Sequence, residues 1–403
     1  MAETSSAPSP NGAAPQSPIV VGAPAESRPG ERRVAVTPAV VAAYEKLGVE
    51  VVVEAGAGEP AGFPDSAYQE RGAVIGTRED ALGADIVACV RVLGADPGSA
   101  DLARLRPGQA VVGMAAPLAA PEVSAAVASR GATLFSLELL PRTTRAQSMD
   151  VLSSQANIAG YRAVLLAALA LPKVFPLLTT AAGTIPPARV FVVGAGVAGL
   201  SAIATARRLG AVVEAYDLRE AAKEEVQSLG ARFVEMALDT GQEGSGSGAY
   251  ASAVGEETLA RQRELMLATV AASDVVITTA QVQGARAPVL ISGEMVGAMR
   301  PGSVVVDLAA EQGGNCELTR AGETVDAGGV RVIGPVDVPS GAPHHASLMY
   351  AKNVANFIGL LVRDGSLVPD SKDDLVAGCT VCRGGEITDA RVRAALEGQG
   401  VGA

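Results

Sequence analysis

A run of glycines follows a strongly apolar segment near the middle of the chain, and its spacing is one that can hold a phosphate. Residues 190–193 are Val-Phe-Val-Val, and they lead directly into Gly194-Ala-Gly196-Val197-Ala-Gly199 and a helical pattern. In such a unit the first glycine permits the tight turn, the second lets the backbone approach a pyrophosphate, and the third allows close packing of helix on strand. The helix N-terminus then faces the anion. The pattern predicts a dinucleotide-binding unit in which Gly194, Gly196, Val197 and Gly199 contact the cofactor.

A carboxylate stands where this unit needs one for the ribose of the nucleotide. Asp217 ends the apolar segment that begins at Val212, and it lies 23 residues after Gly194. It would accept hydrogen bonds from both ribose hydroxyls, whereas a 2′-phosphate would meet an uncompensated carboxylate, which favours NAD(H) over NADP(H). Arg219 leaves a case for the phosphate, and a Rossmann-like fold without nucleotide is the structural alternative. The other residues assigned to the cofactor site are Leu218, Arg219, Thr279 and Ala280.

A second polar group occupies residues 141–157. It includes Arg142, Gln147 and Asp150, followed by Ser153. The group lies between a predicted strand and a predicted interdomain helix, so it borders the cleft in which a nicotinamide ring would lie. The alternative is a solvated loop in which Asp150 serves only as the N-cap of the helix.

The N-terminal half of the chain lacks the acid or base that an amino-acid or hydroxy-acid dehydrogenase needs beside the reacting carbon, which is usually histidine or lysine. The two histidines are His344 and His345, and Lys46 is the one lysine in the first 170 residues. A reaction that transfers no proton to or from a side chain fits this composition.

The elements that must position these residues alternate along the chain. Apolar runs at 19–22, 50–54, 86–90, 110–113 and 133–135 predict strands, and a helix is predicted from the Thr37 N-cap to Leu47, ending at Gly48. Residues 150–171 have the periodicity of one long helix that Pro172 ends. Further strands are predicted at 190–193, 212–216, 275–278 and 304–307, and a helix at 345–362. The predicted fold class is α/β, with two Rossmann-like doubly wound parallel-sheet domains joined by a long helix.

The domain boundaries follow from this order of elements. Residues 1–17 are rich in Ser, Pro and Ala and are expected to form a disordered tail. Residues 18–150 and a returning segment of about 338–385 form the predicted N-terminal α/β domain. Residues 151–337 form the predicted dinucleotide-binding domain and include the interdomain helix. The glycine-rich segment 243–250 within it is expected to be mobile.

Composition limits the possible partners and compartments. The 403 residues carry a formal net charge of -11, which opposes binding to nucleic acid or to an anionic membrane surface. No apolar run approaches the roughly 20 residues of a membrane span. The four cysteines are too scattered for a disulfide framework, which indicates a reducing compartment. Cys379 and Cys382 form a C-x-x-C pair without further ligands, so no metal is assigned and both are expected to lie in a C-terminal strand.

Several of these motifs together resemble the NAD(H)-binding subunit or domain of proton-translocating nicotinamide nucleotide transhydrogenase, a relative of alanine dehydrogenase. The resemblance covers about residues 19–385, and the run at 145–163 is its most specific segment. The matching segments are Arg28-Pro-Gly-Glu31-Arg-Arg-Val-Ala, 142–150 with 153–163, 194–200, Gly248-Ala-Tyr250-Ala, 302–309 and Gly313-Gly-Asn-Cys316.

The resemblance implies roles for particular residues. Arg142, Gln147, Asp150 and Ser153 would surround the nicotinamide end of NAD(H), with Gln147 reaching toward NADP(H) on a partner, and the loop containing Tyr250 would close over the nucleotide. The implied mechanism is direct hydride transfer between two nicotinamide rings, whose C4 atoms must come within about 3–3.5 Å of each other. No protein acid or base is required.

The resemblance also implies partners and a location. Members of the family form homodimers, and they dock on an NADP(H)-binding, membrane-bound beta subunit and a membrane alpha component. The chain would then be cytoplasmic and associated with the inner face of the cell membrane through those partners. It departs from the pattern at Ala25, where relatives often carry lysine, and over the loose match at residues 339–347.

Two alternatives remain open. An alanine-dehydrogenase-like enzyme would have the same fold and cofactor, but relatives of that kind carry lysine and histidine in the first domain. Here residues 90–93 and 113–116 occupy the corresponding strand ends without either type. A non-catalytic NAD(H)-sensing subunit would use the same pocket and differ only in showing no turnover with a partner.

Overall fold

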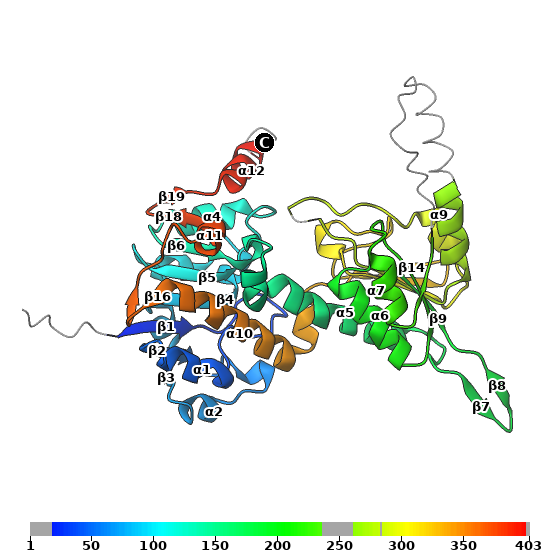
Figure 1. Ribbon diagram of the computed structural model, residues 1–403, viewed down its shortest axis with the longest axis horizontal. Coiled ribbons are helices and arrows are strands. Elements are labelled where there is room, and N and C mark those ends of the chain that lie inside the picture. The colour runs from blue at the N-terminus through cyan, green and yellow to red at the C-terminus, as the bar shows by residue number, and fades with distance from the viewer. Residues whose placement is uncertain (1–17, 236–260, 283, 400–403) are drawn as a thin grey trace, which may run out of the picture.

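The structure of the protein is a computed structural model that describes residues 18–235, 261–282 and 284–399. The described chain forms two lobes, each built around one sheet, and they lie side by side along the longest axis of the molecule (Figure 1). No helix in these ranges is long and apolar enough to cross a membrane.

The first lobe contains an eight-stranded sheet in the order β19-β18-β6-β5-β4-β1-β2-β3. Its parallel strands are β1 (Ile19–Ala23), β2 (Val49–Glu54), β3 (Val74–Gly76), β4 (Ile86–Arg91), β5 (Ala110–Met114) and β6 (Thr133–Ser136). The chain returns near its C-terminal end to add β18 (Thr380–Arg383) antiparallel to β6, followed by β19 (Glu386–Ile387). The short helices of this lobe are α1 (Pro38–Glu45), α2 (Asp65–Gln69), α3 (Arg78–Leu82), α4 (Pro121–Ala128), α11 (Asp374–Cys379) and α12 (Ala390–Gln399).

The second lobe contains a seven-stranded sheet in the order β11-β10-β9-β12-β13-β15-β14. Its strands are β9 (Arg189–Val193), β10 (Val212–Tyr216), β11 (Arg232–Phe233), β12 (Val275–Thr278), β13 (Val304–Asp307), the antiparallel edge strand β14 (Thr324–Ala327) and β15 (Val330–Ile333). Its helices include α6 (Val197–Arg208), α7 (Ala222–Ser228) and α9 (Gly293–Gly297). Strand order reverses between β9 and β12, and in open α/β sheets ligands bind at the carboxyl ends of the strands at such a point.

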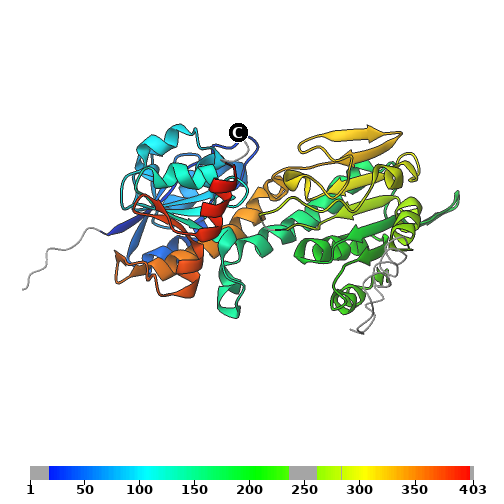
Figure 2. The ribbon, with the colours of Figure 1, turned by 90° about the horizontal axis from the view of Figure 1, so that it is seen from above.

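Two long helices connect the lobes. The helix α5 (Val151–Ala170) begins in the first lobe, where Val151 belongs to the core, and ends in the second, where Ala163 belongs to the other core. The helix α10 (Pro343–Leu361) carries the chain back, and its Tyr350 is fully buried in the first core. A short hairpin of β16 (Val362–Arg363) and β17 (Ser366–Leu367) follows α10. Figure 2 shows both long helices crossing the space between the two sheets.

A two-stranded hairpin, β7 (Leu178–Thr180) and β8 (Gly183–Ile185), extends from the second lobe away from the body of the molecule (Figure 1). All six of its strand residues are exposed. A hairpin of this length is marginally stable by itself in water, so an arm of this kind is typical of a contact with another chain.

The predicted fold class is confirmed, and each predicted strand agrees with the structure to within one residue at either end. The long helix predicted at 150–171 is α5, with Asp150 as its N-cap. The short strands β3, β7, β8, β11, β14, β15, β16, β17 and β19 were not predicted.

Two local predictions are wrong. Thr37 does precede α1, but its hydroxyl makes no capping hydrogen bond and is buried without a partner among the described residues; the helix ends at Glu45 instead of Leu47. Cys379 closes the helix α11 instead of lying in a strand, whereas Cys382 is in β18. Both thiols are free and buried, and no group of three or more His, Cys, Asp or Glu residues in the described ranges could hold a metal ion.

Candidate functional site

The glycine turn between β9 and α6 is shaped by contacts that only glycine permits. Gly194 has a φ of 95°, in the left-handed region. A Cβ atom on Gly199 would lie 1.9 Å from the carbonyl oxygen of Gly194, so the third glycine lets the helix approach the strand. A Cβ atom on Gly196 would meet nothing within 4 Å. The backbone at Gly196 and the N-terminus of α6 therefore face open space, into which a pyrophosphate fits.

Asp217 follows β10 and lies beside this turn. One carboxylate oxygen accepts the backbone N–H of Ala195 at 2.7 Å, and the other accepts that of Arg219 at 2.8 Å. Burial would raise the pKa of Asp217, but its hydrogen bonds from Arg219 and Ala195 outweigh burial and lower it. The carboxylate is thus held as an anion at the edge of the turn, as the ribose-binding role requires.

The expectation that Asp217 is uncompensated is wrong. The Arg219 guanidinium donates to both carboxylate oxygens, through Nε at 3.1 Å and Nη2 at 3.2 Å. A 2′-phosphate would have to attract this exposed guanidinium away from a carboxylate that already binds it. The preference for NAD(H) over NADP(H) is therefore weaker on electrostatic grounds than an isolated acid would make it.

The other side of the switch point is built on Asn315, which the sequence placed only within a matching motif. Its side chain exchanges two hydrogen bonds with the backbone of Ala280, at 3.0 and 2.8 Å. The backbone N–H of Asn315 is held in turn by the buried carboxylate of Asp307 at 2.7 Å. Asp307 also accepts the hydroxyl hydrogen of Thr278 at 2.9 Å, so the ends of β12 and β13 are joined below Thr279 and Ala280.

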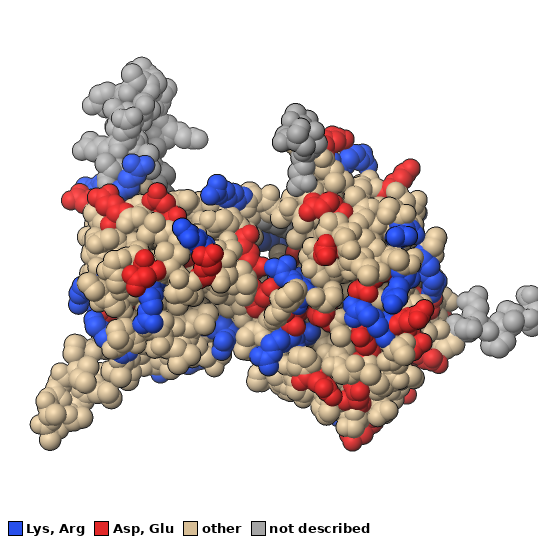
Figure 3. Space-filling model, turned by 180° about the vertical axis from the view of Figure 1, so that it is seen from behind, with Lys and Arg blue, Asp and Glu red and all other residues tan. Residues whose placement is uncertain are grey.

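One large cleft of about 2540 Å³ brings the predicted residues together between the two lobes. The surface is hollowed there, with side chains of both charges around the hollow (Figure 3). The cleft is lined by Arg142, Gln147, Asp150, Ser153, Gly194, Gly196, Val197, Asp217, Leu218, Arg219, Thr279 and Ala280. Gly199 is buried behind the turn and does not line it, and Tyr250 lies outside the described residues.

The segment between β6 and α5 presents its polar side chains to the cleft in two ways. Asp150 caps α5, since its carboxylate accepts the backbone N–H of Ser153 at 2.9 Å and the Ser153 hydroxyl at 2.5 Å. The side chains of Arg142 and Gln147 are exposed, and neither makes a hydrogen bond or ion pair with another described residue. Asp150 is therefore fixed, whereas Arg142 and Gln147 can turn toward a ligand.

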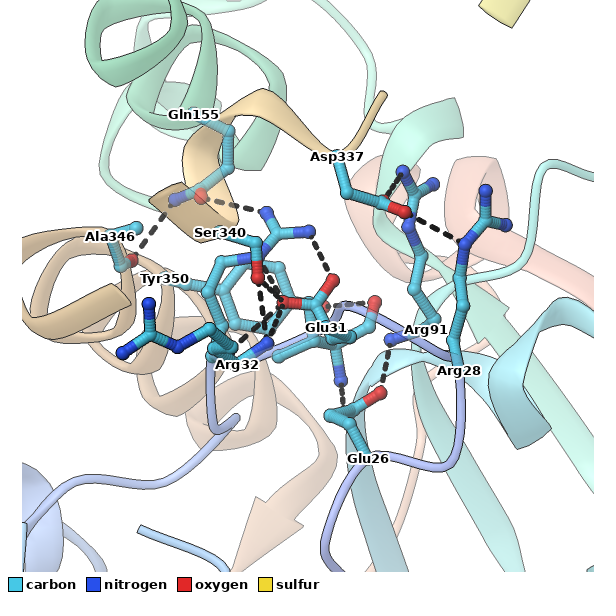
Figure 4. Close-up of polar contacts among 12 residues, drawn as sticks. Glu26, Arg28, Glu31, Arg32, Arg91, Gln155, Asp337, Ser340, Ala346 and Tyr350 are labelled. Carbon is cyan, nitrogen blue, oxygen red and sulfur yellow. Dashed lines mark hydrogen bonds and ion pairs between the residues drawn. The ribbon is translucent and has the colours of Figure 1, made fainter. Parts of the chain in front are cut away.

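Sequence reasoning missed an ionic cluster where the lobes meet. Arg28 and Arg91 of the first lobe each donate to Asp337 at 2.9 Å, and both also approach Glu311 of the second lobe. Figure 4 shows both arginines directed at Asp337. Their partners lie more than 200 residues away in sequence, so no local pattern could have indicated the pairs. The cluster joins the lobes beside the cleft.

A buried ion pair lies beneath this cluster. Arg33 donates to Glu31 through Nε at 2.8 Å and Nη2 at 2.6 Å, and to Gln155 through Nη1 at 2.9 Å. Ser340 donates to the same Glu31 at 2.7 Å (Figure 4). Burial acts to raise the pKa of Glu31, but its hydrogen bonds and charge interaction with Arg33 lower it to about 2. The positive charge of Arg33 is therefore neutralised within the protein.

The cleft has little means of general acid–base catalysis on an amino acid. Neither lysine nor histidine is among the described residues that line it. His344 is stacked on Phe63, with its Nδ1 atom 2.9 Å from the carbonyl oxygen of Ala61. The site therefore offers binding and orientation of two reactants in preference to proton transfer.

Comparison with known proteins agrees with this geometry. Residues 22–159 match the family model described as "Alanine dehydrogenase/PNT, N-terminal domain", and residues 163–390 match its C-terminal counterpart. An NAD(P) transhydrogenase subunit alpha protein of Rhodospirillum rubrum is 46% identical over 94% of this chain and 99% of its own length. A transhydrogenase structure from Sinorhizobium meliloti matches with a TM-score of 0.83 and 45% identity, covering 92% of this chain and all of the other. An alanine dehydrogenase of Mycobacterium tuberculosis is 32% identical over 74% of this chain and 75% of its own length.

Proposed function

Because the chain belongs to the alanine dehydrogenase/PNT family, we propose that it is the NAD(H)-binding component of a proton-translocating NAD(P) transhydrogenase. It exchanges hydride directly between NAD(H) in its own cleft and NADP(H) on a partner subunit. The observation that carries this proposal is the cleft itself, which joins the glycine turn and Asp217 to the exposed Arg142 and Gln147. It offers no lysine or histidine among the described residues as an acid or base.

The proposed mechanism assigns positioning to the chain and hydride chemistry to the coenzyme. Bound NAD(H) supplies or accepts the hydride. The N-terminus of α6 at Gly196 holds the pyrophosphate, and Asp217 accepts from the ribose hydroxyls. Arg142, Asp150 and Ser153 orient the nicotinamide end, and Gln147 is exposed where a second nucleotide could be presented. Catalysis by orientation of this kind can supply roughly 7–11 kcal/mol of the barrier.

A coupled assay tests this function. The purified full chain is mixed with an NADP(H)-binding transhydrogenase component, NADPH and an NAD analogue whose reduced form has a shifted absorbance band. We expect reduction of the analogue only when both proteins are present. Formation of a complex without turnover would instead favour an NAD(H)-sensing subunit.

The alanine dehydrogenase relative supports a second candidate, an NAD-dependent amino-acid oxidoreductase. That activity needs a free cation for the substrate carboxylate and a group for proton transfer. Arg33 is committed to Glu31 and Gln155, and Arg28 and Arg91 are committed to acids. We therefore expect no oxidation of NADH by the chain with pyruvate and ammonium, and turnover in that assay would favour the dehydrogenase.

Asp217→Ala is expected to weaken NADH binding by about 10- to 100-fold, because charge-assisted hydrogen bonds to the ribose contribute about 1.5–3 kcal/mol. Arg219, released from its pair with Asp217, would become available to a 2′-phosphate, so NADPH affinity should rise. Titration of NADH and NADPH against both proteins measures the change, with Arg219→Ala as the matched variant that leaves NADH binding within about twofold. Equal affinity of the wild type for the two coenzymes would contradict the proposed NAD(H) preference.

We also propose that two copies of the chain pair through the β7–β8 hairpin, and that the dimer docks on the NADP(H)-binding beta subunit and a membrane alpha component at the inner face of the cell membrane. Leu178 and Ile185 lie opposite each other on one face of the hairpin, while Thr179 and Thr184 face the other way. Leu178 is 39% exposed and Ile185 is 51% exposed. The charge-free apolar pair is suited to packing against its own symmetry mate.

Introducing Leu178→Asp together with Ile185→Asp is expected to shift the chain from dimer to monomer without unfolding it, because a buried carboxylate opposes association. Analytical ultracentrifugation at fixed protein concentration reports the change. Thr179→Asp is the matched control on the opposite face, and it should leave the dimer intact. Dimers that persist in the double variant would place the interface elsewhere.

A further inference from the structure

The backbone of the loop that carries Gln147 is held by two asparagines of α10. The carbonyl oxygen of Ser148 accepts the side-chain amide of Asn353 at 2.8 Å and that of Asn356 at 2.9 Å. The two asparagines are three residues apart in the helix and therefore share one face. A carbonyl that immediately follows Gln147 in the chain is thus fixed by two donors from a distant segment.

Two further contacts anchor the same loop. Arg145 makes a bidentate pair with Asp373, at 2.7 Å for both bonds, and also contacts Asp374. Asp373 caps α11 by accepting backbone hydrogen bonds from the first turn of that helix. Ala146 and Met149 are buried in the core of the first lobe, on either side of the exposed residues 147 and 148. The loop is therefore tied at several points while its reactive side chain stays free.

We propose that Asn353 and Asn356 are positioning residues for hydride transfer, because they fix the backbone from which Gln147 reaches the second nucleotide. This inference rests on the proposed function. Arg145 and its partner Asp373 set the outer end of the loop, and the two asparagines set the residue that follows Gln147. Reactive groups need placement to within about 0.5 Å, and a loop gains such precision only from contacts of this kind with rigid elements.

The burial of Asn353 separates positioning from simple stabilisation. Its side chain is 8% exposed, and its Oδ1 atom is buried without a hydrogen-bond partner among the described residues. A buried amide with an unsatisfied oxygen costs free energy. Leucine has nearly the same shape and would relieve that cost, while Ser148 is exposed and its carbonyl could bind water instead. Stability alone would therefore not select asparagine at this position.

The test compares Asn353→Leu, Asn356→Leu and the double variant with the wild type, in the full chain mixed with the NADP(H)-binding component. Lys352→Leu, an exposed neighbour on the same helix, is the matched control. Three quantities are measured: the thermal midpoint, the NADH dissociation constant, and kcat and KM for reduction of the NAD analogue. Hydrogen exchange at the amides of residues 144–149 reports the order of the loop directly.

We expect the double variant to keep its thermal midpoint and to bind NADH within about twofold of the wild type. Its kcat should fall by roughly 10- to 100-fold, because a displacement of about 1 Å can cost that much, and its loop amides should exchange faster. Asn356→Gln, which keeps a donor, should recover some of the rate in the Asn356 position. The inference is overturned if kcat stays within twofold, or if it falls only in proportion to a loss of stability or of NADH affinity. If the wild type itself shows no turnover, the proposed function fails, and unchanged hydrogen exchange in the variants would then overturn the positioning role separately.

Discussion

Replacing Glu31 with glutamine is expected to lower the free energy of unfolding by about 3–5 kcal/mol, because it leaves the Arg33 guanidinium buried without a counter-charge. The side chains of Glu31 and Arg33 are 0% and 1% exposed, so water cannot take over from the lost carboxylate. Glu31 also accepts from the Ser340 hydroxyl and from the backbone of Arg32 and Arg33, and a neutral amide can serve fewer of these donors. Urea denaturation of the two proteins measures the difference.

The control for this substitution is Glu323→Gln. Glu323 pairs with Arg320 at 3.8 Å, but both side chains are more than half exposed, so its loss should change the stability by less than about 1 kcal/mol. Combining Glu31→Gln with Arg33→Met should restore some of the lost stability, since the uncompensated charge is then removed. A single-variant cost as small as that of Glu323→Gln would contradict the role assigned to the buried pair.

The same pair predicts the direction of the pH dependence. The pKa of Glu31 falls from its usual 4.5 to about 2 in the folded chain. A carboxyl group with a lowered folded pKa contributes stability that is fully present above pH 4.5 and is lost as the pH falls toward 2. The difference in stability between the wild type and Glu31→Gln should therefore shrink over this acid range and stay constant from pH 5 to 8.

The features of this protein that could be predicted from sequence are those in which neighbouring residues carry the signal. The strands 190–193 and 304–307 are short runs of buried apolar residues, and the turn at Gly194 has both its spacing and its flanking elements in one segment. The N-cap role of Asp150 is also local, since its partner Ser153 lies three residues away.

The remainder depended on pairs that the sequence separates widely. Ser340 reaches Glu31 across 309 residues, and Asn353 reaches Ser148 across 205. No periodicity encodes such contacts, because only the assembled fold brings the segments together. The pairing of Asp217 with Arg219 failed for another reason: the two residues are close in sequence, but which one the guanidinium faces depends on side-chain geometry at the end of β10. Short edge strands such as β14 owe their conformation to a neighbour and not to their own pattern.

These long-range pairs all act on the cleft from behind. The contacts of Asn353, Asp373 and Asp307 fix backbone segments from which the exposed groups project, and none of the three lines the cleft itself. The residues that would touch coenzyme are few, and the rigid support around them is large. Substitutions in the support should therefore change stability or rate, whereas substitutions at the surface of the cleft should change affinity.

Gly196→Ala is expected to weaken NADH binding by about 10- to 100-fold while leaving the folded protein nearly as stable as the wild type. Gly196 has a φ of -74° and a ψ of -169°, an extended conformation that alanine adopts without strain, and the added Cβ atom would meet nothing within 4 Å. The methyl group would instead occupy the space in which a pyrophosphate approaches the backbone, at a cost of about 1.4–2.8 kcal/mol in binding. Calorimetric titration with NADH, beside a thermal melt, separates the two effects.

Gly199→Ala should behave in the opposite way, because its Cβ atom would lie 1.9 Å from the Gly194 carbonyl oxygen and force α6 away from β9. We expect that variant to lose stability and coenzyme binding together. Gly297→Ala is the neutral comparison, since its Cβ atom also meets nothing within 4 Å but lies in α9, away from the turn. NADH binding by Gly196→Ala with wild-type affinity would mean that no phosphate lies over this turn, and the assignment of the coenzyme to the second lobe would then fail.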